Sequence, residues 1–514
     1  MTQPSNDAPA LIPRRVVFLY LLAVVVFLYP LTFILPFVPI YQGDNAPVYL
    51  LNASRMAHGE VLYRDIFELT WPGTEWFYLR RFAIFGERAW IPAIVLIIIG
   101  AGMAWAGVSV SRRVLRGATA LLPATLFLSF AFAHALDATH HWFSLLLTLA
   151  ALATLIQERT VKRLLAAGVL SGFATICTQT RGALVVLSFA AFLIWEWRNK
   201  KFPRRRLVRG ELALLGGYLA ACLPLLAVPI IQAGWRPFVQ DTILFPLRWY
   251  SFFDRNNLGV YMADIPEFSG LVEIPALAIW LFIHLLTPLV YLVFFARYRQ
   301  SARSRPDQPW DRLMLVNFMG LAWVAAIASA PNWFKIASAS LPALILFVYL
   351  IGMEGRPARF MRRALWIAAL AAAAYSPAMT QLGWHGVLTT PAGRIALLDS
   401  VRNAKFDWVS RHTRPGDYFF EAGDTDLYFP LGLRNPSEVP FMTPTDYTRP
   451  EQVARTLISL QVRRVRYVVW SPWLDLPDRA MRAGDHLGPL RILMRQAYRV
   501  VKTFEDGDQV WERK

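Results

Sequence analysis

Long apolar runs recur along roughly the first three quarters of the chain, from Val16 to about Leu382, and short polar clusters separate them. A run of about 17–25 apolar residues has the length of a helix that crosses the hydrocarbon core of a bilayer. Hydropathy identifies about eleven such runs. They lie near residues 16–36, 89–110, 117–134, 141–157, 163–180, 182–197, 211–232, 274–296, 312–330, 336–354 and 364–382. The pattern predicts a polytopic α-helical membrane domain over residues 1–382.

The sequence after about Gly383 has the mixed pattern of an ordinary globular domain. Turn-rich stretches there separate short segments with helical or strand-like spacing. The helical segments are 395–411 and 450–460, and the strand-like segments are 418–421, 467–470 and 499–504. We therefore expect a small extracytoplasmic α/β domain at residues 383–514.

Basic residues alternate between the loops on the two sides of the predicted bundle. The basic loops contain Arg14 and Arg15, Arg112 to Arg116, Arg159 to Arg163, Arg198 to Arg209, Arg297 to Arg305, and Arg356 to Arg363. The intervening short loops at 135–141 and 331–335 carry almost none. The positive-inside rule therefore places the N-terminus in the cytoplasm. An odd number of spans then places the C-terminal domain outside it, in a multi-pass protein of the inner (plasma) membrane.

Charge and cysteine content change this interpretation little. The net charge of +18 would suit a nucleic-acid-binding protein. Most of the excess lies in the short basic loops, so we expect the bilayer and no nucleic acid as a partner. Cys177 and Cys222 lie inside predicted spans, which favours neither a disulfide framework nor a thiolate metal site. Residues 1–15 carry no cleavage-site pattern, so the first apolar run is expected to be a retained helix.

The first outward loop, residues 37–88, is long and rich in aromatic and charged residues. Residues 46–58 place apolar side chains on one side and polar ones on the other, as in an interfacial amphipathic helix. Pro72 is a typical first residue of a second helix. Asp44 lies just before the first helix, where an acid needs a partner or a wet cavity. Asp44 is also a typical helix cap, and that role does not exclude a catalytic one.

This loop resembles the first outward loop of the GT-C glycosyltransferases. The bacterial branch with protein O-mannosyltransferases, the lipid A aminoarabinose transferase and lipopolysaccharide-core transferases is especially similar. Its members have an acid after the first helix, a stretch that ends in Tyr-Arg-Asp, and then a proline with aromatic residues. Asp44, Tyr63-Arg64-Asp65 and Trp71-Pro72 match that pattern. Many relatives have two adjacent acids where this chain has Asp44-Asn45, which puts a paired-carboxylate mechanism in doubt.

The resemblance covers essentially the whole chain and implies a transferase. A sugar would move from a polyprenyl-phosphate carrier to a glycan, lipid or protein acceptor outside the cytoplasm. Asp44 would act as the general base on the acceptor hydroxyl or orient it. Tyr63, Arg64 and Asp65 would support the acceptor or the active site. The leaving phosphate needs cations.

Asp137, His140 and His141 lie in the outer loop between the third and fourth predicted spans. They are candidates to bind the carrier phosphate or a divalent metal ion, and Asp137 would support the acceptor or the active site. The alternative is a hydrogen-bonded loop with Trp142 as an interfacial residue. Their spacing is not a recognised zinc pattern, so no metal is assigned.

Arg181 and Lys335 are isolated cations in outer loops. A guanidinium group pairs well with phosphate oxygens, so Arg181 is the main candidate to bind the carrier phosphate and Lys335 the second. The alternative is that both contact lipid headgroups.

Two other classes of membrane protein remain open. A transporter or flippase would show two related halves with ionisable groups near mid-bilayer, and the sequence has no such repeat. A polysaccharide polymerase or ligase would place its functional residues in a later loop, and residues 233–273 form one; we expect it to be a mobile wall over the acceptor site. Asp424-Thr-Asp426 resembles a nucleotide-sugar motif, but in the external domain it is expected to be a turn.

Overall fold

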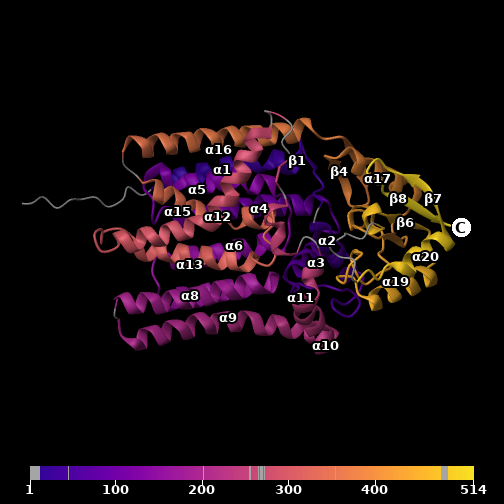
Figure 1. Cartoon of the computed structure of the whole chain (residues 1–514), viewed down its shortest axis with the longest axis horizontal. Helices are drawn as coiled ribbons and strands as arrows, with labels where there is room; N and C mark the ends of the chain where they lie inside the picture. Colours follow the sequence, from indigo (N-terminus) through magenta and orange to yellow (C-terminus); the bar gives the residue numbers. More distant parts are fainter. Residues whose placement is uncertain are drawn as a thin grey trace, which may run out of the picture.

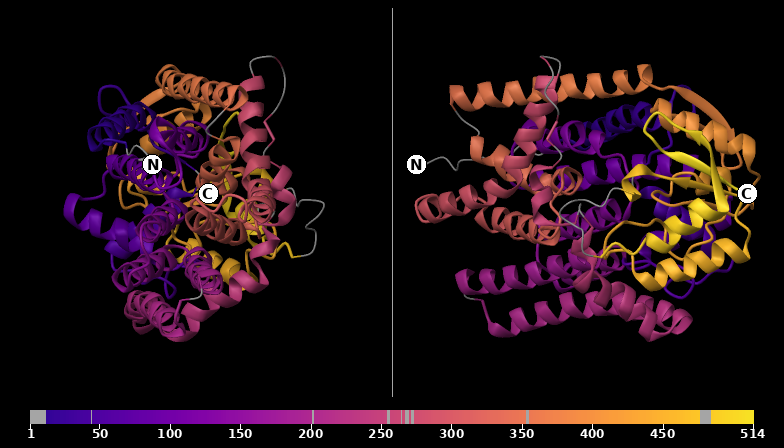
Figure 2. Two further views of the ribbon diagram at one scale, coloured as in Figure 1. Left: turned by 90° about the vertical axis from the view of Figure 1, so that its left-hand side faces the viewer. Right: turned by 45° about the vertical axis from the view of Figure 1, so that its right-hand side comes forward.

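The computed structural model consists of a helical body with a mixed α/β domain at one end (Figure 1). It describes residues 12–43, 45–200, 202–253, 256–263, 265–266, 270, 273–352, 355–475 and 484–514. Most long helices of the body run side by side along the long axis, and the C-terminal elements cover one end of the bundle (Figures 1 and 2). The predicted fold class, a polytopic helical body followed by a small α/β domain, is confirmed.

Eight helices within the described ranges are long and apolar enough to cross a bilayer. They are α1 (Arg14–Thr32), α4 (Trp90–Ser111), the segment 117–134, α8 (Gln179–Lys200), α9 (Arg204–Ala233), α12 (Ile274–Ser301), α13 (Trp310–Ile327) and α16 (Arg356–Leu382). The segment 117–134 combines η1 (Gly117–Leu121), α5 (Leu122–Phe130) and η2 (Phe132–His134). Side chains such as Phe18, Leu212 and Phe360 are exposed by 67%, 68% and 74%. So much exposed apolar surface suits contact with lipid, and the protein is a multi-pass membrane protein.

Three shorter helices occupy the remaining predicted spans. They are α6 (His140–Leu155), α7 (Val161–Cys177) and α15 (Ser340–Ile351). At 1.5 Å per residue, the 12 residues of α15 rise only about 18 Å, less than the roughly 30 Å of a hydrocarbon core. The number of helices that meet the length and hydropathy of a span is therefore smaller than the predicted number.

Glycines let α7 and α9 approach closely. A Cβ atom at Gly168 would lie 2.0 Å from the carbonyl oxygen of Leu214, and one at Gly217 would lie 2.4 Å from that of Leu165. Small residues at such contacts are typical of packed membrane helices. This packing fixes α7 and α8 at the end of the body where the candidate site lies.

The first outer loop packs between the helical body and the C-terminal domain. It contains the short strands β1 (Phe33–Ile34) and β2 (Val38–Pro39), and the helices α2 (Ala46–Ala57) and α3 (Gly73–Phe85). The polar side of α2 does not face water, because Asn52 is fully buried and Arg55 is only 7% exposed. The rings of Phe82 and Phe429 stack at 5.3 Å and join α3 to the C-terminal domain.

The later outer loop and the outer end of the tenth predicted span form short helices. They are α10 (Trp235–Val239), η3 (Gln240–Leu244), α11 (Phe245–Arg248), η4 (Tyr250–Phe252), η5 (Leu258–Met262) and α14 (Trp333–Ser338). The ring of Phe245 packs against Tyr447 of the C-terminal domain at 5.1 Å. This loop therefore forms one wall of the space between body and domain.

The C-terminal domain contains a hairpin of β3 (Gly386–Thr390) and β4 (Gly393–Leu397), and a four-stranded sheet of order β5-β6-β8-β7. The sheet strands are β5 (Phe419–Glu421), β6 (Tyr467–Trp470), β7 (Tyr498–Thr503) and β8 (Gln509–Arg513). Only β5 and β6 are parallel. The accompanying helices are α17 (Ser400–His412), α18 (Tyr428–Leu431), α19 (Pro450–Val462), η7 (Pro472–Leu474) and α20 (Gly488–Ala497). The helix expected at 395–411 begins only at Ser400, because the residues before it pair in β4.

Candidate functional site

Asp137 holds the start of α2 from a distant loop. Its Oδ1 accepts the backbone N–H of Ala46 at 2.8 Å, and its Oδ2 accepts that of Asn45 at 3.4 Å. A carboxylate at a helix N-terminus satisfies free N–H groups and interacts favourably with the helix dipole. The side chain is only 4% exposed. The predicted metal or phosphate candidate is thus in contact with the first residues of α2.

Asp44, the predicted base, lies outside the described residues. Its neighbour Asn45 is the N-cap residue of α2, and the Asn45 side chain makes no capping hydrogen bond. Asp137 therefore supplies a side-chain cap at the start of α2.

The rings of His140 and His141 lie close together at the start of α6, with their centres 3.9 Å apart and their planes tilted by 40°. His140 Nδ1 shares a short hydrogen bond with the Tyr49 hydroxyl of α2. His141 packs against the ring of Phe334 at 5.3 Å, and its Nδ1 has no hydrogen-bond partner in the described part of the chain. The pair thus joins α2, α6 and α14.

Arg181 is 1% exposed at the first turn of α8. Its Nη1 donates to the His141 carbonyl and the Ser144 hydroxyl, each at 2.9 Å. Neither partner is a carboxylate, and Nε has no partner among the described residues. A buried guanidinium group without a counter-ion favours an anion that completes its hydrogen bonds.

Lys335 lies in α14, next to the Phe334 ring that touches His141. Its Nζ donates to the Tyr250 hydroxyl at 3.3 Å. Burial, and then the charge of nearby Arg181, lower the pKa of Lys335 to about 8. The two outer-loop cations are therefore close enough to repel each other.

The structure thus brings five sequence candidates together at one end of the body: Asp137, His140, His141, Arg181 and Lys335. Within the described ranges, no group of three or more His, Cys, Asp or Glu side chains could hold a metal ion.

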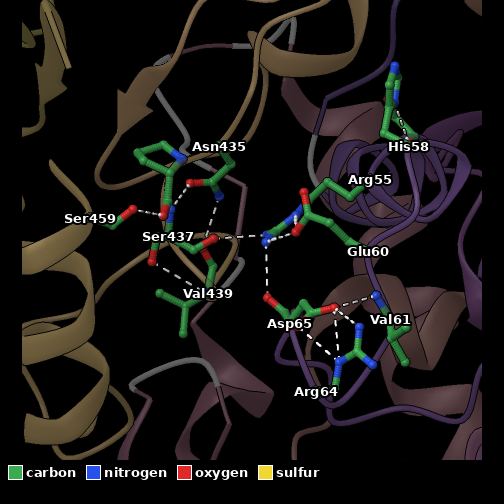
Figure 3. A network of polar contacts seen from close by, with 12 residues as sticks. Arg55, His58, Glu60, Val61, Arg64, Asp65, Asn435, Ser437, Val439 and Ser459 are labelled. Carbon is green, nitrogen blue, oxygen red and sulfur yellow. Dashed lines mark hydrogen bonds and ion pairs between the residues drawn. The ribbon is translucent and has the colours of Figure 1, made fainter. Parts of the chain in front are cut away.

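Tyr63, Arg64 and Asp65 lie apart from this cluster, beside the C-terminal domain. Arg64 pairs with Asp65 at 2.8 Å, and Asp65 also accepts the N–H of Val61 at 2.9 Å. The close-up view shows Arg55 linking this turn to the domain (Figure 3). Arg55 donates to the Asp65 carbonyl at 3.1 Å and to the Ser437 carbonyl at 2.9 Å. The turn is therefore part of the joint between body and domain.

A cavity of about 180 Å³ opens beside this turn. Tyr63 and Arg64 line it together with Asp241 and Trp249 of the later outer loop and Arg449 of the domain. Burial, and then Glu438 and Glu68, raise the pKa of Asp241 to about 8. Arg449 lies 4.5 Å from the centre of the Trp249 ring. An aromatic face among carboxyl, amide and guanidinium groups suits a hydroxyl-rich ligand.

Sequence reasoning missed a buried acid pair, Glu68 and Glu75. Glu68 accepts hydrogen bonds from Asn52 at 3.0 Å and from the N–H and hydroxyl of Thr70 at 2.9 Å each. Both Glu75 oxygens are buried with no partner in the described structure. Burial, and then Glu68, raise the pKa of Glu75 well above its usual value. Helical spacing was the available signal, because Glu75, Tyr78 and Phe82 fall on one face.

The segment with Asp424 and Asp426 joins the domain to the first outer loop. Asp426 Oδ2 lies 2.5 Å from Arg402 Nε, and the Asp426 carbonyl accepts the Tyr41 hydroxyl at 3.0 Å. Arg402 Nη1 in turn donates to the Tyr41 carbonyl at 3.0 Å. These contacts are structural and lie three residues before Asp44 in the sequence.

No family model and no curated relative matches the chain. Solved structures do share its fold. The oligosaccharyltransferase AglB from Archaeoglobus fulgidus, in complex with an inhibitory peptide and a dolichol-phosphate, matches with a TM-score of 0.53 at 11% identity, over 97% of this chain and 74% of that chain. Its apo form matches with a TM-score of 0.50 at 12% identity, over 89% and 70%.

ArnT from Cupriavidus metallidurans, bound to undecaprenyl phosphate, matches with a TM-score of 0.57 at 12% identity, over 97% of this chain and 98% of that chain. At identities this low, the structural matches establish a common fold and nothing more. The chain therefore shares a fold with AglB and ArnT.

Proposed function

We propose that this protein transfers a sugar from a polyprenyl-phosphate carrier to an acceptor outside the cytoplasm. The observation that carries the proposal is the pair of cations, buried Arg181 and half-buried Lys335, at one end of an apolar helical body. Two cations favour an anionic ligand, and an apolar body favours an apolar one. Undecaprenyl phosphate and dolichol-phosphate, the lipids in the ArnT and AglB structures, combine an apolar chain with an anionic phosphate group.

The carrier phosphate would bind between Arg181 and Lys335. Two like charges in a buried site raise each other's free energy, and an anion between them turns that repulsion into attraction. The free Nε of Arg181 and the Nζ of Lys335 supply donors, and the His140–His141 pair lines the same region. When the sugar leaves, these cations would stabilise the charge on the released phosphate.

Asp44 would be the general base. The acceptor proton would pass to its carboxylate while the acceptor oxygen attacks the anomeric carbon. The bond from that carbon to the phosphate oxygen then breaks, and the phosphate keeps the electron pair. Because Asp137 already accepts the N–H groups at the start of α2, the Asp44 carboxylate is not required as a cap.

The acceptor would approach through the cavity beside Tyr63, Arg64 and Asp241, with Asp65 fixing the turn. This cavity lies between the first outer loop, the later outer loop and the C-terminal domain. Hydroxyl groups of a glycan, lipid or protein could bind its carboxyl and amide groups.

The proposed orientation has the N-terminus in the cytoplasm and the C-terminal domain outside, in the inner membrane. The arrangement of loops supports it. The last turns of α8, α12 and α15 and the first turns of α9, α13 and α16 lie at the end of the body away from the C-terminal domain (Figure 1). These turns carry the basic residues. A reporter enzyme fused after Lys514 should be active only in the extracytoplasmic compartment, and cytoplasmic activity would contradict the orientation.

The decisive test of the function compares two ligands that differ only in the phosphate. Purified protein in detergent should bind undecaprenyl phosphate and bind undecaprenol at least about tenfold more weakly, because the two cations favour the anion. Equal affinity for both would refute a phosphate site. A flippase would bind the carrier too, but would leave the sugar–phosphate bond intact in a vesicle assay with a radiolabelled donor.

A further inference from the structure

A second hollow, of about 640 Å³, lies in the C-terminal domain. It forms where α17 ends and where the turns before β5 and β6 begin. Five of its lining residues are arginines: Arg411, Arg414, Arg463, Arg464 and Arg466. We refer to it as the arginine hollow.

The arginine hollow faces away from the helical body. The C-terminus lies at the end of the molecule farthest from the body (Figure 1). Arg466 pairs at 3.0 Å with Glu512, two residues before that end, and Tyr467 is in register with Glu512. The opposite end of β5 leads to the Asp426 segment that contacts Tyr41. A lipid headgroup is therefore the wrong ligand for the hollow, and the ligand must come from water.

Positive charge in the hollow exceeds the negative charge available to it. Arg411 pairs with Asp407 at 2.8 Å, and Glu512 is shared by Arg466 and Arg499. The one acid in the lining, Asp417, accepts the backbone N–H of Arg414 at 2.8 Å. Neither Arg414 nor Arg464 forms an ion pair within the described residues. Crowded guanidinium groups of this kind are stabilised by a multivalent anion.

Aromatic faces hold part of this charge in place. The Arg463 guanidinium group lies 4.2 Å from the centre of the Tyr418 ring, and Arg466 lies 4.7 Å from that of Tyr467. His412 stacks on Trp408 with ring centres 3.9 Å apart. A guanidinium group that lies over a ring keeps its N–H groups available for phosphate or carboxylate oxygens.

The main chain at Arg464 adopts an unusual conformation. Arg464 has φ 47°, in the left-handed region where glycine is the favoured residue. Hydrogen bonds from Arg464 N to Gln461 O at 3.2 Å and from Val465 N to Leu460 O at 3.1 Å hold this turn after α19. An arginine in that conformation is strained, and such strain is common at functional sites.

We propose that the arginine hollow binds a saccharide that carries phosphate or carboxylate groups. A volume of about 640 Å³ exceeds the needs of a lone inorganic anion and falls in the range of ligand pockets. Ten residues of α17 separate His412 from Arg402, which contacts Tyr41, and they rise about 15 Å. An anionic glycan bound in the hollow could therefore extend toward the first outer loop. If that glycan is the acceptor, the inference deepens the proposed function and rests on it.

The test measures binding alone, so it does not depend on sugar transfer. Full-length protein in detergent is titrated with dextran phosphate, neutral dextran of the same length and inorganic phosphate, with calorimetric detection. Wild-type protein should bind dextran phosphate, with an affinity that falls as salt rises. Neutral dextran and inorganic phosphate should bind at least about tenfold more weakly. Dextran binding equal to that of dextran phosphate would overturn the role of charge, and equally tight inorganic phosphate would overturn the saccharide.

Variants locate the site. Arg414→Gln/Arg464→Gln removes two of the three lining arginines that form no ion pair among the described residues, and should weaken dextran phosphate binding about tenfold or more. Arg495→Gln/Lys502→Gln removes two exposed cations of the same domain that lie outside the hollow. This variant should change the affinity for dextran phosphate less than twofold. An unchanged affinity in the first variant, or equal losses in both, would refute the inference. An Asp44 variant that loses sugar transfer but binds dextran phosphate normally would bear on the proposed transfer reaction and not on the arginine hollow.

Discussion

Asp137 accepts the backbone N–H of Ala46 at 2.8 Å across 91 positions of sequence, and so fixes where the first outer loop begins its first helix. The carboxylate belongs to the short loop before α6, whose first residues are the His140–His141 pair. One side chain therefore couples the segment that follows Asp44 to the segment that contacts Arg181.

Asp137→Ala should destabilise the protein by about 0.5–2 kcal/mol, the usual cost of losing a helix cap. Asp137→Asn should recover most of that loss, because an amide oxygen still accepts one backbone N–H. The measurement is the thermal unfolding temperature of the purified proteins in the same detergent. An Asp137→Ala protein as stable as wild type would show that α2 does not depend on this contact.

Arg181→Ala should weaken binding of undecaprenyl phosphate by about tenfold or more and leave binding of undecaprenol unchanged. Arg181→Lys should recover only part of the loss, since a single ammonium replaces a planar fork of donors. Arg356→Ala, at an exposed position at the start of α16, is the matched control and should bind like wild type. Normal phosphate affinity in Arg181→Ala would reduce Arg181 to a structural residue.

Binding of the carrier phosphate should also depend on pH through Lys335. The pKa of Lys335 in the free protein is about 8, because burial and Arg181 disfavour its charged form. Below that pH the ammonium is charged and attracts the phosphate; as the pH rises above about 8, affinity should fall by up to about tenfold per unit. Lys335→Arg should bind with little change between pH 7 and 9, since arginine stays charged. A wild-type affinity that is flat over this range would contradict a role for Lys335.

The apolar pattern predicted the long helices of the body and a mixed domain near the C-terminus. It did so because a helix that faces lipid consists mostly of apolar residues, which are visible in the sequence as a long apolar run. The strand β8 was missed because its five residues, Gln509–Arg513, show no regular alternation of apolar and polar positions. Asn52 and Arg55 were expected to face water, yet they are buried against Glu68 and Ser437. A helical pattern shows which residues share a face, but not that another domain covers it.

The candidate residues of the outer loops were visible as isolated polar groups, but their partners were not. Nothing in local spacing indicates that Asp137 reaches Ala46, or that Arg181 donates to the His141 carbonyl. Glu75 was hidden for a different reason. An acid in the first turn of a helix is ordinary on a surface, and only the packing of α3 shows that it is buried.

Glu75→Gln should stabilise the protein at neutral and alkaline pH. Burial and Glu68 raise the pKa of Glu75 in the folded state, whereas the unfolded chain releases the proton near the ordinary carboxyl pKa. The folded state therefore binds more protons above that pH, and wild-type stability falls as the pH rises, by up to about 1.4 kcal/mol per unit. The variant should unfold at a higher temperature than wild type at pH 8 and at a similar one at pH 4.5. Glu505→Gln, at an exposed position, should behave like wild type at both. If the unfolding temperature falls equally between pH 4.5 and pH 8 in wild type and in Glu75→Gln, the Glu75 carboxyl group does not hold the proton.

Asp44→Asn should abolish sugar transfer while leaving the fold and carrier binding intact. Asparagine keeps the size of the side chain and its ability to accept a backbone hydrogen bond, but it cannot take a proton from a hydroxyl group. Loss of a general base typically lowers the rate about 10²–10⁴-fold. A cap alone would predict no loss, because asparagine caps a helix as well as aspartate does. Asp137 already accepts the first N–H groups of α2, so the stability of that helix should not change.

The measurement combines three readouts on one purified Asp44→Asn protein: unfolding temperature, affinity for undecaprenyl phosphate, and transfer of radiolabelled sugar from a polyprenyl-phosphate donor. Asp307→Asn, at an exposed position in the turn between α12 and α13, is the matched control and should be normal in all three. Normal stability and carrier affinity with a transfer rate at least about 100-fold below wild type would assign the base, since that is the lower end of the expected loss. A transfer rate equal to that of wild type would remove Asp44 from the chemistry. The remaining candidates would be Asp137, at the start of α2, and Asp241, in the lining of the cavity beside Tyr63.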